Sequence, residues 1–308
     1  MGNQKSVVAV VVTWNRRELL KQNLNCLLEQ KDAHCDILLV DNASTDGTAE
    51  MVKNDFCDSR IHYVNTGANL GGSGGFEFGI DKAVGMGYDY VWIMDDDSMP
   101  QPNALKELLI ADEALEGSWG FLSSAVYWTD GSVCKANRVK KDLFRHVKEE
   151  EYKKTLVPIV MGSFVSMLVP SKVIREVGLP IGEYFIWTDD YEFSARISKR
   201  YPCYLVASSK VTHAMANNTR ANLVTADDTR IARFHYLYRN DVHCYRQQGL
   251  LGYSYLLAKG VFTAADVALH AKDSKIQRLK IMLQGYSEGL SFHPVVREVK
   301  DTANSSIM

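Results

Sequence analysis

The run from Ser6 to Thr13 constrains the fold of this chain more than any other stretch. It reads SVVAVVVT, so apolar residues follow one another without the polar alternation of a half-exposed strand. A continuous β-branched run of this length is typical of a strand that is buried on both faces. Such strands occur in parallel sheets with helices on either side, and the run therefore predicts an α/β fold.

Three further strand-like runs follow, at residues 36–40, 61–64 and 90–95, and helical patterns separate them. After the first strand, Asn15 and Glu18 have the spacing of a capping box, which predicts the start of a helix. The leucines of its expected buried face are Leu20, Leu24, Leu27 and Leu28. This alternation predicts a doubly wound sheet, whose ligands bind beyond the carboxyl ends of the strands.

Polar stretches follow three of these strands and should meet at one edge of the sheet. They are a turn that begins at Asp41, the glycine-rich segment 65–75, and the triplet Asp95–Asp97. The segment NTGANLGGSGG predicts either a flexible linker or a loop that opens a helix at Phe76 and binds phosphate with its backbone N–H groups. The three carboxylates predict either a solvated acidic turn or a site with a cationic partner, because buried like charges repel. Their convergence favours a site.

The chain is less regular after residue 118. Residues 119–158 predict a surface excursion, and residues 159–169 predict a strand. Asp189 and Glu192 then have the spacing of a capping box, which leaves Asp190 at the first turn of a helix. The helix dipole favours an ionised carboxylate at that position, which suits a base.

His213 follows a predicted strand, and on composition alone a single histidine is more often structural than a ligand. After about residue 225 the spacing predicts helices with many tyrosines and arginines. Their outer faces predict ordinary helix packing or a surface that meets a membrane or a partner, and the residues alone do not separate these interpretations.

Composition excludes some function classes. The net charge is −2 and no long basic block occurs, which argues against nucleic-acid binding. The six cysteines have no CxxC spacing, so we expect free thiols in a reducing, cytoplasmic compartment. No stretch approaches the 18 apolar residues or so of a membrane span.

Residues 6–215 resemble family 2 glycosyltransferases with the GT-A fold. The resemblance rests on motifs that occur in a fixed order and together are specific, and the galactofuranosyltransferase and rhamnosyltransferase branch is the most similar. The motifs are VVVTWNR, LLVDNASTDGT, NLGGSGGF, WIMDDDS, WTDDYEFSARI and the strand-borne His213.

The resemblance implies a Rossmann-like mixed central sheet flanked by helices, with a helical C-terminal extension. The implied catalytic domain covers residues 1–224, with a nucleotide-binding half at about 1–115 and an acceptor-binding half at about 116–224. Residues 225–308 would form the helical region, whose role the resemblance does not define.

The resemblance also implies roles for individual residues. Asp41 would bind the base of the nucleotide, and Asp190 would deprotonate the acceptor hydroxyl in an inverting transfer. Asp95, Asp97 and His213 would hold Mn²⁺ or Mg²⁺, and Asp96 would contact ribose or sugar. Other residues expected around the donor are Thr13, Asn15, Asn42, Asn69, Gly71, Gly72, Gly74, Gly75 and Trp187.

The implied donor is a UDP-sugar, with UDP-galactofuranose as the first hypothesis, and the implied acceptor is a lipid-linked glycan or a polysaccharide. A dTDP-rhamnosyltransferase of the same fold and a nucleotide-sugar-binding module without transfer activity are the alternatives. A nucleotidyltransferase is disfavoured, because no Lys/Arg-rich triphosphate loop accompanies the glycines. The helical tail would contact the inner face of a membrane, the acceptor or a second subunit.

Overall fold

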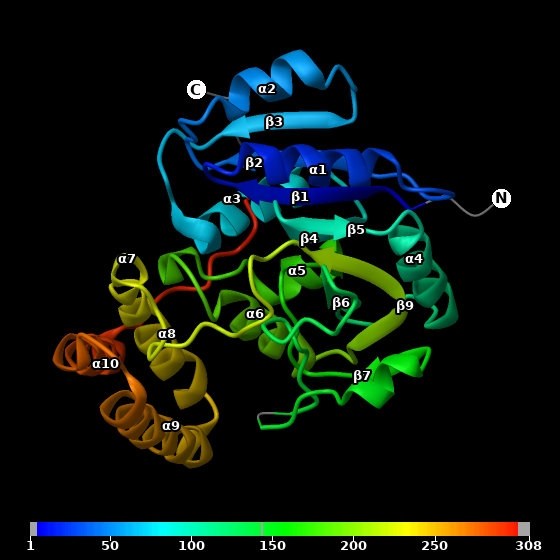
Figure 1. Cartoon of the computed structure of the whole chain (residues 1–308). Coiled ribbons are helices and arrows are strands. Elements are labelled where there is room, and N and C mark those ends of the chain that lie inside the picture. Colours follow the sequence, from blue (N-terminus) through cyan, green and yellow to red (C-terminus); the bar gives the residue numbers. More distant parts are fainter. Residues whose placement is uncertain (1–4, 143, 301–308) are drawn as a thin grey trace. The chain divides into compact units, whose positions relative to one another are not determined.

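The computed structural model describes residues 5–142 and 144–300, and it divides into two compact units (Figure 1). Unit 1 comprises Met1–Gly182, Asp190–Thr219 and Val296–Met308, and unit 2 comprises Glu183–Asp189 and Arg220–Val295. Residues 301–308 of the predicted helical region lie outside the described residues.

Unit 1 is built on a mixed sheet, which in the described residues has nine strands in the order β3-β2-β1-β4-β8-β6-β9-β5, with β7 paired to β9. The first four strands pair in parallel, whereas β8 runs antiparallel to both β4 and β6. The strands are β1 (Val7–Thr13), β2 (Asp36–Asp41), β3 (Ile61–Asn65), β4 (Tyr90–Asp95), β5 (Ser98–Pro100), β6 (Leu122–Trp128), β7 (Leu156–Pro158), β8 (Met167–Pro170) and β9 (Tyr204–His213).

Helices cover both faces of this sheet, as the buried first strand predicts. Every residue of β1 is buried, and its residues alternate between two hydrophobic clusters. Val8 and Val10 face the cluster with α3, α5 and α6, whereas Val7 and Ala9 face the cluster with α1, α2 and α4. The helices are α1 (Arg17–Leu28), α2 (Thr48–Asp55), α3 (Gly71–Gly85), α4 (Ala104–Ala114), α5 (Ser171–Val177) and α6 (Asp189–Ser198), with short 3-10 turns at Glu149–Lys153 and Gly182–Tyr184. The predicted α/β class is confirmed.

The glycine-rich segment is not a loop before a helix at Phe76, because α3 begins at Gly71. Close packing on the sheet explains why glycines occupy its first turns. A Cβ atom on Gly75 would lie 2.5 Å from Val12 Cγ1, and a Cβ atom on Gly79 would lie 2.6 Å from Val10 Cγ1. Helix α3 therefore approaches β1 more closely than any side chain at these positions would permit.

Two other local predictions are wrong. Helix α1 begins at Arg17, so Asn15 does not cap it; the Asp46 carboxylate accepts a 3.0 Å hydrogen bond from the Arg17 N–H instead. Of residues 159–169, only those from Met167 onward are in a strand, β8. The preceding backbone pairs with the excursion at Lys140 instead, through bonds of 2.8 and 2.9 Å.

Unit 2 is helical, which confirms the predicted helical extension of the fold. Its helices are α7 (Asp228–Ile231), α8 (Phe234–Arg246), α9 (Gly249–His270) and α10 (Lys275–Ser291). Phe234, Tyr238, Val267 and Met282 form the centre of its core. None of the helices in the described part of the chain combines the length and the apolar character needed to cross a membrane.

Candidate active site

The carboxyl ends of β1, β2 and β4 bring the first predicted site residues to one edge of the sheet. Thr13 lies in register with Asp41, and Val12 lies in register with Asp95. The predicted convergence follows from this parallel pairing, since the carboxyl ends of adjacent parallel strands lie at the same edge of the sheet.

Strand β9 brings His213 to the same edge from 116 residues further along the chain. His213 pairs with Ser98 of β5, directly after the acidic triplet, and its Nε2 lies 2.9 Å from Asp97 Oδ1. One ligand atom each from Asp95, Asp97 and His213 lies within 4.8 Å of the other two. Two carboxylates and an imidazole at this separation fit a divalent cation such as Mn²⁺ or Mg²⁺.

Arg16 supplies the cationic partner that the acidic triplet requires, and the sequence analysis missed it. Its guanidinium Nη1 lies 2.6 Å from Asp97 Oδ2 and 3.1 Å from Asp96 Oδ1. The signal that could have identified it is its place in VVVTWNR, where it is the first basic side chain after a strand that ends at the site edge.

Burial and neighbouring charges distribute protons unevenly over the cluster. Burial, together with repulsion from Asp97, raises the pKa of Asp95 to about 7. Burial also acts to raise the pKa of Asp97, but the hydrogen bond from His213 and the Arg16 charge hold it at about 2. Burial opposes protonation of His213, yet the hydrogen bond to Asp97 and the nearby carboxylates raise its pKa to about 10. Without a metal ion, Asp97 is therefore ionised and His213 carries a proton at neutral pH.

Asp96 is engaged by the protein through both carboxylate oxygens. It is 3% exposed, and it accepts hydrogen bonds from Thr13 Oγ1 at 2.7 Å and from Arg16. Burial raises the pKa of Asp96 to about 6. In this structure Asp96 joins β1 to the acidic turn.

The Asp41 carboxylate is buried and fixed by two neighbours that the sequence did not single out. Its Oδ1 accepts a 2.8 Å hydrogen bond from the Ser44 N–H, and its Oδ2 accepts a 2.7 Å bond from the Tyr63 hydroxyl. Asn15 lies beside this turn, where its Oδ1 accepts a 2.7 Å bond from the Thr45 N–H. The three hydrogen bonds order the polar turn after β2.

Residues at the start of α3 differ in the space around them. Asn42 Nδ2 donates to the Gly71 carbonyl at 2.9 Å, and Asn69 Oδ1 accepts from the Gly71 N–H at 2.9 Å. A Cβ atom on Gly74 would lie 2.8 Å from Leu70 Cβ, whereas a Cβ atom on Gly72 would meet nothing within 4 Å. Gly72 is thus exposed to open space, while Gly74 and Gly75 serve packing.

Asp190 lies in the first turn of α6, half-buried, and its Oδ1 accepts a 2.7 Å hydrogen bond from the Tyr191 N–H. Glu192 of the same helix accepts a 2.9 Å hydrogen bond from Arg196, one helical turn later. Arg196 also donates to the Leu179 carbonyl at 2.9 Å. These bonds fix the helix that carries Asp190 within unit 1.

Trp187 belongs to unit 2, where its ring centroid lies 5.1 Å from that of Phe234. It has a φ of 67°, and Thr188 has a φ of 70°, a conformation that costs non-glycine residues energy. The fully buried Asn240 of α8 donates to the Trp187 carbonyl at 3.0 Å and to those of Ile186 and Tyr184. These three bonds from Asn240 could not be predicted from the sequence, because an asparagine inside a helical pattern carries no local signal.

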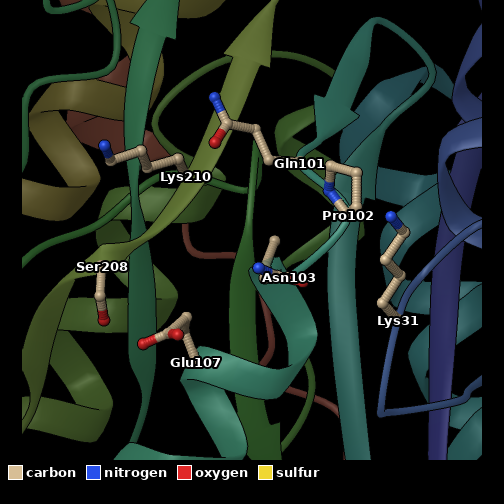
Figure 2. A pocket seen from close by; sticks show the side chains of 8 residues that line it. Lys31, Gln101, Pro102, Asn103, Glu107, Ser208 and Lys210 are labelled. Carbon is tan, nitrogen blue, oxygen red and sulfur yellow. The ribbon is translucent and has the colours of Figure 1, made fainter.

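A separate pocket of about 340 Å³ lies at the start of α4 (Figure 2) and includes none of the predicted site residues. Figure 2 shows Lys31, Lys210 and Glu107 among its lining side chains. Nothing in this pocket links it to the acidic cluster.

Comparison with known proteins agrees with this architecture. Residues 8–121 match the family model "Glycosyl transferase family 2". A galactofuranosyltransferase, GlfT1 of Mycolicibacterium smegmatis, is 28% identical over 204 residues, which cover 64% of this chain and 67% of the relative.

Solved structures share the fold at low sequence identity. Residues 1–349 of S. aureus TarS in complex with UDP match with a TM-score of 0.54 and 13% identity, over 93% of this chain and 72% of TarS. GalNAc-T7 with UDP, GalNAc and Mn²⁺ matches with a TM-score of 0.56 and 14% identity, over 78% of this chain and 52% of GalNAc-T7. The matched segment, the relative and the fold together show a glycosyl transferase family 2 domain at residues 8–121, and the chain is identified as a glycosyltransferase with a GT-A fold.

Proposed function

We propose that this chain transfers a sugar from a UDP-sugar to a glycan acceptor, with a divalent cation and with inversion at the anomeric carbon. The observation that carries the proposal is the cluster of Asp95, Asp97 and His213 at the carboxyl edge of the sheet. A sheet edge of this kind is where α/β proteins bind nucleotides. Three potential ligands, from the end of β4, the turn after it and the distant strand β9, also exceed what a solvated acidic turn needs.

The donor would lie along the ends of β1, β2 and β4. In this proposal Asp41 binds the uracil, Thr13, Asn15 and Asn42 border the nucleoside, and Asn69 and Gly71 to Gly75 border the sugar and diphosphate. Open space beside Gly72 supports a close approach by the donor. UDP is preferred because GlfT1 is named as a galactofuranosyltransferase and because TarS and GalNAc-T7 are described with UDP. UDP-galactofuranose is therefore the first donor to test.

A divalent cation, when bound by Asp95, Asp97 and His213, supplies positive charge for the diphosphate leaving group. Asp190 accepts the proton from the acceptor hydroxyl as that oxygen attacks the anomeric carbon. The first-turn position of Asp190 favours its ionised form, and the Tyr191 N–H orients one of its oxygens. Asp96 accepts hydrogen bonds from Thr13 and Arg16, and its contact with ribose or sugar stays a prediction.

The experiment uses the purified full chain with Mn²⁺ and measures nucleotide release from UDP-galactofuranose, UDP-galactose, UDP-glucose and dTDP-rhamnose. We expect release from a UDP-sugar, its loss on chelation with EDTA and a strong decrease in Asp97→Asn. Preference for dTDP-rhamnose would select the rhamnosyltransferase alternative. Tight UDP-sugar binding by calorimetry, with no turnover on any glycan acceptor, would select the binding module and contradict transfer.

The acceptor is proposed to be lipid-linked, so unit 2 would contact a membrane surface peripherally. The outward face of α9 carries apolar side chains along its whole length, with Leu250 87% and Leu257 72% exposed. Exposed Lys272 and Lys275 lie at its C-terminal end, and Lys275 Nζ donates to the Ala268 carbonyl at 2.7 Å. An apolar helix face beside lysines complements anionic lipids. The six free cysteines support a reducing, cytoplasmic location.

Vesicle flotation tests this face. The chain should float with vesicles of phosphatidylcholine and phosphatidylglycerol, and the double variant Leu257→Asp, Val261→Asp should not. Ile110→Asp is the matched control, because Ile110 is 48% exposed on α4 of unit 1. A chain that ignores vesicles but forms dimers that the double variant loses would show that the face joins two copies instead.

A further inference from the structure

We propose that Asn137 is a positioning residue for the cation site, which it serves by holding the His213 imidazole with Nε2 directed at the acidic cluster. Asn137 Oδ1 lies 2.8 Å from His213 Nδ1, on the side of the ring opposite the 2.9 Å contact between Nε2 and Asp97. The inference rests on the proposed function in one respect, namely that Asp95, Asp97 and His213 bind a divalent cation.

A hairpin after β6 holds Asn137 at this position. Strand β6 pairs with β9 up to Trp128 and His213, and the chain then turns back, with Cys134 N–H bonded to the Val126 carbonyl at 3.0 Å. Cys134 is fully buried, and its Sγ lies 3.2 Å from Asn137 Oδ1. The asparagine oxygen thus faces two donors, the Cys134 thiol and the imidazole N–H, which agrees with an oxygen rather than an amide nitrogen at that position.

The contact of Asn137 with His213 Nδ1 determines which imidazole nitrogen carries the hydrogen in the neutral ring. An acceptor at Nδ1 keeps the Nδ1 hydrogen in place, so in the neutral ring the lone pair is on Nε2 and faces the carboxylates. Hydrogen bonds of this kind orient metal-ligating histidines, and their loss typically weakens metal affinity about 10- to 100-fold. Asn137 lies in the excursion at residues 119–158, after the matched family segment, which ends at residue 121.

A purely structural role would be to fasten the hairpin to the sheet, and Asn218 provides the control for that role. Asn218 Oδ1 accepts a 2.7 Å bond from the Lys135 N–H, and its Nδ2 donates to Ser132 Oγ at 2.9 Å. Asn218→Ala therefore loosens the same hairpin without removing a contact of His213. Asn137→Leu keeps the size of the side chain and removes the acceptor, whereas Asn137→Asp keeps an acceptor.

The experiment measures Mn²⁺ binding by the full chain without donor or acceptor, from the electron paramagnetic resonance signal of free Mn²⁺ at pH 7.5. Asn137→Leu should weaken Mn²⁺ affinity about 10- to 100-fold. Asn137→Asp and Asn218→Ala should stay within about threefold of the unsubstituted chain. Crystal structures of the metal-free Asn137→Leu and Asn137→Asp chains give a second readout, in which the imidazole should turn away from Asp97 in the first only.

Equal Mn²⁺ affinity and an unmoved imidazole in Asn137→Leu would overturn the positioning role. Equal weakening in Asn137→Leu and Asn218→Ala would also overturn it, because the hairpin as a whole would then be responsible. If the unsubstituted chain binds no Mn²⁺, the cation part of the proposed function fails, and the orientation of the imidazole in the two crystal structures still decides the role of Asn137.

Discussion

The two halves of unit 1 contribute to one site through different kinds of strand pairing. In the first half, β1 to β4 pair in parallel, and β1, β2 and β4 carry polar residues at their carboxyl ends. In the second half, β9 pairs with β5, β6 and β7 and brings His213 to a carboxylate 116 residues earlier. Strand β6 also shifts register against β9 between Ser124 and Ala125. The first half presents an acidic edge, and the second half completes it.

The largest expected effect concerns the second half, which would supply the base. Asp190→Asn should lower kcat about 10²- to 10⁴-fold, because the acceptor hydroxyl loses its proton acceptor. KM for the donor should change little, since the first half is proposed to bind the donor. Steady-state kinetics measures both values.

Glu192→Gln is the matched control on the same helix. It weakens the bond to Arg196 and should lower the free energy of unfolding more than it lowers kcat. If Asp190→Asn retained the kcat of the unsubstituted chain, the division of roles between the halves would be wrong.

The pH dependence of the free energy of unfolding tests the ion pair of Asp97 and His213, which joins the two halves. We expect this free energy to change by a few kcal/mol. The folded-state pKa of Asp95 is raised to about 7 and that of His213 to about 10, so the folded chain holds more protons than the unfolded chain. The metal-free chain should therefore lose stability as pH rises. The loss from Asp95 falls between about pH 4 and 7, and the loss from His213 falls between about pH 6.5 and 10. Urea unfolding at several pH values measures this.

Asp97→Asn should flatten the alkaline part of that profile, because it removes the carboxylate that holds the His213 proton. Saturating Mn²⁺ should flatten it as well. A metal-free chain whose stability rises from pH 7 to 10 would contradict the ion pair between the halves.

The smallest expected effect concerns the packing of α3 against β1 in the first half. Gly75→Ala should lower the free energy of unfolding by about 1–3 kcal/mol, because its Cβ would collide with Val12. A Cβ atom on Gly72 of the same helix would meet nothing within 4 Å, so Gly72→Ala should raise the free energy of unfolding by roughly 0.5–1 kcal/mol. Chemical denaturation measures both. Equal effects of the two substitutions would contradict the close approach of α3 to β1.

The same difference in strand pairing explains what the sequence could predict. The buried run of β1, the strands through Asp95 and the convergence of the turn at Asp41, the segment after β3 and the triplet at Asp95 depend on local patterns and parallel topology, and they are confirmed. The predicted helix cap at Asn15 is wrong, because Asp46, 29 residues after Arg17, supplies the acceptor for the Arg17 N–H at the helix start.

Long-range contacts also account for the other errors and omissions. The strand predicted for residues 159–169 is mostly absent, because Lys140 of the excursion takes up its backbone bonds. Arg16, Asn137 and Asn240 each act through a partner at least 50 residues away. The glycines of α3 look like a loop in the sequence because only the side chains of Val10 and Val12 reveal why a helix needs them.

A crystal structure of the chain with UDP and Mn²⁺, recorded at the manganese absorption edge, tests the central claim most directly. We predict one anomalous peak within about 2.0–2.6 Å of an Asp97 carboxylate oxygen and of His213 Nε2, with the diphosphate completing the coordination. An anomalous peak elsewhere, or UDP bound with no ion between it and Asp97, would contradict the claim that the two halves of unit 1 build one cation site.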